Sequence, residues 1–119
     1  MELDIKAFAR KPASERVEWF RFKQDFEVQL TFAPAKEQAE FLGTVGSMKR
    51  GNLKIDDAKS RDYWCSHATD WRGLTKGGVP QPFDMGDLRD YYDLDVDFRI
   101  WLVERCQDID GFLGTTQAA

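Results

Sequence analysis

The chain has 119 residues and a mass of 13.8 kDa, which is the size of a single domain. Hydrophobic residues make up 42% of it and charged residues 32%, which excludes disordered, collagen-like and disulfide-dense proteins. The apolar runs are only a few residues long, which excludes a membrane span, and the net charge of −4 disfavours nucleic acid as a partner.

The N-terminal part of the chain predicts a small antiparallel sheet. Residues 2–8 alternate apolar and charged side chains, residues 16–22 are rich in aromatics, and residues 26–32 alternate strictly. The intervening residues 23–25 suit a short hairpin connection. Because a two-stranded hairpin alone is marginally stable, we expect the strand at residues 2–8 to join it as the third strand.

The remainder of the chain predicts about four helices. We expect one from Pro34 to the Gly51-Asn52 pair, one over residues 55–71, a short one after an N-cap at Asp84, and a last one that follows a cap at Asp95 or Asp97 and runs to Leu113. Strands first and helices second predict an α+β fold, with the helices packed on one face of the sheet. We expect a single domain over residues 1–119, mainly β over 1–33, mainly α over 34–113 and frayed over 114–119.

Few residues suggest catalysis or metal binding. Cys65 and Cys106 lie on apolar faces of the predicted helices, so we interpret them as buried, reduced core residues of a cytosolic protein. His67 is the single histidine, and we interpret it as a partly exposed helix residue. It lies two residues after Cys65, and side chains at that spacing point to different sides of a helix, so the two do not form a pair within it. The acidic run at residues 93–97 lacks the central glycine and closing glutamate of a calcium loop. The sequence therefore predicts no catalytic, metal or cofactor site.

The most specific stretch of the sequence is a helix end followed by a glycine turn and a proline-stiffened return. It reads Asp70-Trp71-Arg72-Gly73-Leu74, and then Gly77-Gly78-Val79-Pro80-Gln81-Pro82-Phe83-Asp84. The prolines force an extended return, and the aspartate caps the next helix. We predict a corner that fixes two helices relative to each other.

With Leu88 and the closing helix around Trp101, this stretch resembles the tail assembly chaperones of long-tailed bacteriophages and prophages, over about residues 62–113. The resemblance implies a non-enzymatic protein of the bacterial host cytoplasm. Such a protein binds the long, helical tape-measure protein during tail morphogenesis, has the tail tube protein as a second partner, and is compatible with homo-oligomers.

A chaperone of this kind must present apolar surface to its client. We therefore expect an exposed apolar patch larger than a few hundred Å². The candidate client-binding residues flank the predicted apolar stripes and are Phe41, Tyr91, Tyr92, Phe112 and Leu113.

Two alternatives remain open at this point. One is a small structural tail protein of the ring-forming terminator or connector type, which would self-associate into a closed oligomer. The other is a small hydrolase that uses Cys106 or Cys65 with His67, which requires a thiol within hydrogen-bond reach of the imidazole.

Overall fold

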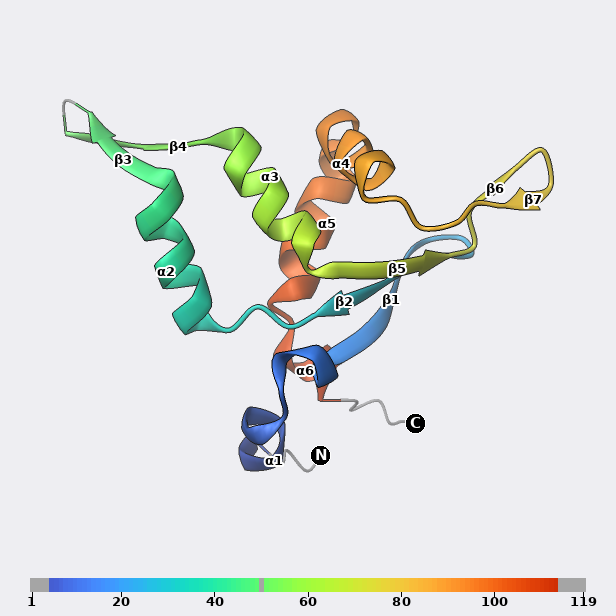
Figure 1. The fold of residues 1–119 in the computed structure, drawn as a ribbon, viewed down its shortest axis with the longest axis horizontal. Helices are drawn as coiled ribbons and strands as arrows, with labels where there is room; N and C mark the ends of the chain where they lie inside the picture. The colour runs from blue at the N-terminus through green and yellow to red at the C-terminus, as the bar shows by residue number, and fades with distance from the viewer. Residues whose placement is uncertain (1–4, 50, 114–119) are drawn as a thin grey trace.

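The computed structural model describes residues 5–49 and 51–113, and Figure 1 shows their arrangement. Over these residues the chain forms a three-stranded antiparallel sheet, two further two-stranded hairpins, six α-helices and one short 3-10 helix. The α+β class is therefore confirmed. The strands, however, alternate with the helices along the chain instead of preceding them.

The central sheet has the order β1-β2-β5. Its strands are β1 (Val17–Lys23), β2 (Phe26–Thr31) and β5 (Ala68–Arg72). The predicted hairpin between β1 and β2 is confirmed, and Gln24 in its turn has a positive φ of 47°. The apolar residues of β2 face the core and its polar residues face outward, as strict alternation predicts.

The third strand of the sheet is β5, not the predicted strand at residues 2–8. Residues 5–8 belong to helix α1 (Ile5–Arg10), and residues 2–4 lie outside the described residues. The helix buries Phe8, whose ring packs edge-on against Phe32 with 5.4 Å between the ring centroids, and leaves Ile5 50% exposed. A strand with Ile5 inward would have placed Phe8 on the solvent face, so burial of the aromatic ring favours the helix. The 3-10 helix η1 (Ala13–Glu15) then leads into β1.

A β-bulge in β5 explains why the sequence predicted helix as far as residue 71. Two consecutive residues of β2 lie opposite Asp70 and Ala68, so Thr69 is the extra residue of the bulge. The bulge places Ala68 and Trp71 on the same buried face although they are three residues apart. Three is also a helical spacing. The helix prediction is therefore wrong for residues 68–71.

The first predicted helix is shorter than expected. Helix α2 (Ala35–Val45) begins directly after Pro34, as predicted, but does not continue to Gly51. Instead the chain forms a hairpin of β3 (Gly46–Lys49) and β4 (Asn52–Ile55). The extended backbone of Gly46, with ψ of 145°, ends the helix.

The C-terminal helices are α3 (Asp57–Ser66), α4 (Met85–Leu94), α5 (Val96–Cys106) and α6 (Ile109–Phe112). The predicted caps are confirmed at two of them. The carboxylate of Asp84 accepts a hydrogen bond from the backbone N–H of Asp87, and that of Asp95 accepts from the N–H groups of Asp97 and Phe98. These bonds satisfy backbone donors that have no partner within the helix.

The last predicted helix is divided into α5 and α6. The carboxylate of Asp108 accepts a hydrogen bond from the backbone N–H of Gly111 and thereby begins α6. A Cβ atom on Gly111 would lie 2.7 Å from the Phe20 ring, so a larger residue would push that ring aside where α6 packs against β1. The break turns Phe112 into the core.

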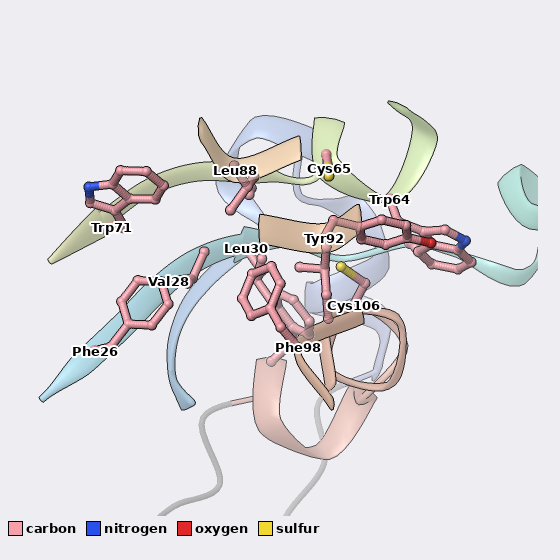
Figure 2. Packing of buried hydrophobic residues seen from close by; sticks show 14 of the residues in the cluster. Phe26, Val28, Leu30, Trp64, Cys65, Trp71, Leu88, Tyr92, Phe98 and Cys106 are labelled. Carbon is pink, nitrogen blue, oxygen red and sulfur yellow. The ribbon is translucent and has the colours of Figure 1, made fainter. Parts of the chain in front are cut away.

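The core lies between the sheet and helices α3, α4 and α5. Figure 2 shows the side chains of β2 facing those of α4 and α5. The side chains with no exposed surface are Val28, Leu30, Cys65, Leu88, Phe98, Leu102 and Cys106. Both cysteines are free and buried, as the sequence predicts.

Ion pairs on the surface connect helices α3, α4 and α5. The guanidinium of Arg61 lies 2.8 Å from the carboxylate of Asp93 and 3.0 Å from that of Asp62. Asp62 also pairs with Arg89, and Asp93 with Arg99. A connected network of this kind fixes the three helices relative to one another more firmly than isolated surface pairs would.

The molecule is flatter and more extended than its length predicts. The radius of gyration is 15.9 Å and the extents are 49 × 43 × 22 Å, whereas a compact domain of this length has a radius of gyration of about 13.5 Å. Figure 1 shows the reason: α2 and the β3–β4 hairpin extend from one side of the sheet, and a second hairpin projects from the other.

Within residues 5–49 and 51–113, every helix is too short or too polar to cross a lipid bilayer. The predicted frayed segment at residues 114–119 lies outside the described residues.

Candidate functional site

Two adjoining cavities open beside the predicted corner at residues 70–84. The first has a volume of about 300 Å³ and is lined by Trp71, Leu74, Gln81, Asp87 and Tyr91. The second has a volume of about 400 Å³, shares Leu74 and Tyr91 with the first, and extends to the β1–β2 turn at residues 23–26. The two cavities adjoin at these two side chains, and we call them together the corner groove.

The wall of the corner groove is built by the chain that follows β5. Strands β6 (Thr75–Lys76) and β7 (Val79–Pro80) form the hairpin that projects in Figure 1. The chain then returns to β5, where the indole N–H of Trp71 donates a hydrogen bond to the carbonyl of Gln81 at 3.0 Å. The ring of Phe83 packs edge-on against Trp71. The predicted corner is thus present, but it joins a strand to a helix because residues 68–72 are extended.

Gly73 brings the backbone of the corner into close contact with the β1–β2 turn. Its φ is +88°, and a Cβ atom at this position would overlap the backbone carbonyl of Asp25. Only glycine tolerates both the positive φ and the close backbone approach. The turn of the first hairpin and the start of the projecting hairpin are therefore held together at the second cavity, whose lining includes Gly73 and Asp25.

Tyr91 forms the floor that the two cavities share. Its ring stacks on that of Phe98, with 4.4 Å between the centroids, and lies edge-on to Phe22. Burial, assisted by a hydrogen bond to the Asp95 carboxylate, raises the pKa of Tyr91 to about 12. At neutral pH the phenol is therefore uncharged and hydrogen-bonded within the protein, and its ring is held in place as part of the shared floor.

The rim of the groove carries charges of both signs. Asp87 lines the first cavity, on the exposed side of α4. Lys23 lines the second cavity, and its amine lies 5.1 Å from the centroid of the Phe22 ring. Asp25 also lines the second cavity, so a ligand that spans both cavities would meet Asp87 in the first and both Asp25 and Lys23 in the second.

The lining of the first cavity can bind apolar groups. Trp71, Leu74 and Tyr91 supply apolar and aromatic contact area, which is what binding hollows use for affinity. Neither cavity is lined by a cysteine or a histidine. Among the residues that the structure describes, no three His, Cys, Asp or Glu side chains gather closely enough to hold a metal ion.

The structure places the five predicted client-binding residues in different environments. Tyr91 lines the groove, Leu113 is half-buried at the C-terminal end of α6, and Phe41 of α2 stacks face to face on Tyr63 with 4.0 Å between the centroids. Tyr92 and Phe112 are 5% and 6% exposed, so the expectation that they are exposed is wrong. Tyr92 turns inward because it lies four residues after Leu88 on the buried face of α4, and Phe112 because α6 packs against β1.

The strongly exposed apolar residues near α4 and α5 are different from the predicted ones. Leu94, Val96 and Ile100 are 85%, 64% and 51% exposed. Val96 and Ile100 are one helical turn apart and so share a face of α5, away from the buried stripe of that helix. Because both residues lie outside the periodic apolar stripe of this helix, the sequence could have predicted that they are exposed.

His67 is buried, which corrects the expectation that it is partly exposed. Its Nδ1 atom lies 2.8 Å from Thr31 Oγ1, and its Nε2 atom lies 2.8 Å from a carboxylate oxygen of Glu37. The phenol of Tyr63 donates to the same carboxylate oxygen. The histidine thus connects β2, α2 and α3 from the position where α3 ends.

Both ring nitrogens of His67 already have oxygen partners, and neither partner is a thiol. This geometry does not support the alternative of a Cys–His hydrolase. The Thr31–His67–Glu37 arrangement lies outside both cavities of the corner groove, and it holds α2 to the sheet.

We expect both thiols to be unreactive in the folded protein. Burial raises the pKa of Cys65 to about 12 and that of Cys106 still further, so almost no thiolate is present at neutral pH. Reaction with a thiol reagent should modify neither cysteine in buffer and both in concentrated guanidinium chloride. Rapid modification of the native protein would contradict the described burial.

The tyrosines should make the protein less stable in alkali. The chain has three tyrosines, Tyr63, Tyr91 and Tyr92, and burial is the main reason why the pKa of each is raised. The folded chain therefore binds more protons than the unfolded chain above about pH 10, and the free energy of unfolding falls as the pH rises from about 10 to about 12. Tyrosinate absorbance should appear only as the circular dichroism signal is lost. Titration of the tyrosines near their ordinary pKa of about 10 while the protein is still folded would contradict this expectation.

No protein family model, curated protein or solved structure matches the chain. The function is therefore inferred from the residues and geometry of this chain.

Proposed function

We propose that the chain is a tail assembly chaperone of a long-tailed bacteriophage or prophage, which binds the tape-measure protein in the host cytoplasm. The observation that carries the proposal is the corner groove. Trp71, Leu74 and Gln81 belong to the stretch by which the sequence resembles that family, and the same three residues line the first cavity of the groove, whose lining is largely apolar.

The groove suits a segment of an amphipathic polypeptide better than a small ligand, because the lining of the first cavity is mainly apolar and that of the second is mainly polar. Its two cavities adjoin and have volumes of about 300 and 400 Å³, so neighbouring side chains of one polypeptide can occupy them together. An amphipathic helix binds in this way, through side chains three and four residues apart. Leu94, Val96 and Ile100 offer further apolar contact area on α4 and α5.

The proposal also accounts for the polar rim. A chaperone must release its client when the tail tube, its proposed second partner, polymerises. A half-open groove lined partly by charged residues binds less firmly than an enclosed apolar core. Asp87, Asp25 and Lys23 supply those charges.

Co-expression with the tape-measure protein of the same tail gene cluster tests the proposal. We expect the chain to keep the tape-measure protein soluble and to co-purify with it. Leu74→Ser should lower the recovery, because Leu74 lines both cavities. Val79→Ser is the matched control, since Val79 is 62% exposed and lines neither cavity.

A second variant separates loss of binding from loss of folding. Thr75→Trp should obstruct the second cavity without touching the core, because Thr75 is exposed on β6. Thermal unfolding of each variant checks the fold. Undiminished recovery with both groove variants would contradict the proposal, and so would a closed ring that assembles alone and ignores the tape-measure protein.

A further inference from the structure

The corner groove contains a carboxylate without a partner. Asp87 lines the first cavity, and its side chain forms no hydrogen bond or ion pair with any described residue. Among the neighbouring acidic residues, Asp84 and Asp95 cap helices and Asp93 pairs with Arg61 and Arg99, whereas Asp90 is exposed and lines neither cavity. Asp87 is thus the acidic residue of α4 that both lines the first cavity and remains available to a ligand.

The side chains around Asp87 are those that favour a cation with an apolar stem. Trp71 and Tyr91 present aromatic rings, and a guanidinium is attracted to an aromatic face as well as to a carboxylate. Leu74 offers apolar contact to the methylene groups of a long side chain. The cavity, at about 300 Å³, is large enough for one such side chain.

We infer that the first cavity of the corner groove binds an arginine side chain of the client polypeptide. The stem of the arginine lies on Leu74, and its guanidinium lies between the aromatic rings and the carboxylate of Asp87. The inference rests on the proposed function, because it names the feature that the client must carry. It predicts that client segments have an arginine at the edge of an apolar helical face.

Other occupants fit the cavity less well. A purely apolar side chain would partly desolvate Asp87 without pairing it, which costs free energy. An acidic side chain would be repelled by Asp87 and by Asp84 and Asp90 on either side of it along the chain, in a protein whose net charge is −4.

A double-mutant cycle with defined peptides tests the inference. The probe is a helical peptide of about 18 residues, made of Leu, Ala and Gln with a single central arginine, so that it spans about five turns. Its partner peptide carries citrulline, which has the same shape without the charge. The protein variants are Asp87→Asn and, as a matched control, Asp90→Asn, which removes the same charge from α4 at a position that lines neither cavity.

We expect Asp87→Asn to weaken binding of the arginine peptide by about five-fold or more, and binding of the citrulline peptide by less than about two-fold. Asp90→Asn should change neither by more than about two-fold. Among the four indole N–H resonances, that of Trp71 should move on binding. The coupling between Asp87 and the arginine of the peptide should decrease as the salt concentration is raised from about 50 to about 500 mM, because salt partly screens charges in a half-open site.

Three results would overturn the inference: equal losses for both peptides, an equal effect of the control variant, or an arginine peptide that does not bind wild-type protein at millimolar concentration. These results are distinct from failure of the proposed function. If Asp87→Asn recovers as much tape-measure protein as the wild type while Leu74→Ser recovers less, the chaperone proposal holds and the arginine site is wrong. If the cycle shows coupling but the tape-measure protein is never recovered, the chaperone proposal is wrong.

Discussion

Replacing Gly73 with alanine should destabilise the fold by at least about 3 kcal/mol, since a strained positive φ costs about 1–3 kcal/mol and overpacking adds a similar amount. The φ of Gly73 is +88°, and the added Cβ would overlap the backbone carbonyl of Asp25. The β1–β2 turn must therefore move away from the start of the projecting hairpin. Chemical denaturation of the variant and the wild type measures the difference.

The matched control is Gly43→Ala in helix α2. A Cβ atom at Gly43 meets no atom within 4 Å apart from its chain neighbours and the backbone of its own helix. Because alanine favours helix over glycine, the control should be neutral or stabilising by up to about 1 kcal/mol. Equal stability of the Gly73 variant and the wild type would show that the two turns do not touch as described.

Replacing Phe98 with alanine should cost about 3–5 kcal/mol, the usual loss for a fully buried aromatic ring. Phe98 has no exposed surface, and its ring stacks on Tyr91 and meets Phe22 edge-on at 5.2 Å between centroids. Loss of the ring leaves a cavity between α5 and the sheet and removes the support of the groove floor. Since small domains are stable by about 5–15 kcal/mol, a large share of the folded population would be lost on mild heating.

Ile100→Ala is the control for this variant. Ile100 is on the same helix and is 51% exposed, so its truncation should change the free energy of unfolding by less than about 0.5 kcal/mol. A loss at Ile100 that matched the loss at Phe98 would mean that the two faces of α5 are assigned the wrong way round.

The features predicted well from the sequence are those fixed by close neighbours along the chain. Strict alternation over residues 26–32 identified β2, and the aspartates at positions 84 and 95 identified two helix starts. Each depends on residues within about one turn or one strand, so a single sequence suffices.

The features predicted badly depend on partners far away in the sequence. Residues 68–71 form a strand because β2 offers an edge to pair with, and the bulge at Thr69 gives them a helix-like spacing. His67 is buried because Thr31 and Glu37 are available to its two ring nitrogens. Neither partner is visible from the local pattern.

The candidate site shows the same division. The glycine turn and the proline-stiffened return were predicted from residues 73–82, and the structure contains both. The convergence of Leu74, Asp87 and Tyr91 was not predicted, because it requires α4 to pack beside the corner. Tyr91 and Tyr92 illustrate the limit: adjacent positions on one helix face a groove and the core, respectively.

Hydrogen exchange of the complex with the tape-measure protein tests the central claim most directly. If the client binds in the corner groove, backbone amides of residues 71–76 and 81–91 should exchange more slowly in the complex than in the free chain, while those of α1 remain unchanged. Slower exchange confined to α1 or α2, with the corner unaffected, would contradict the account.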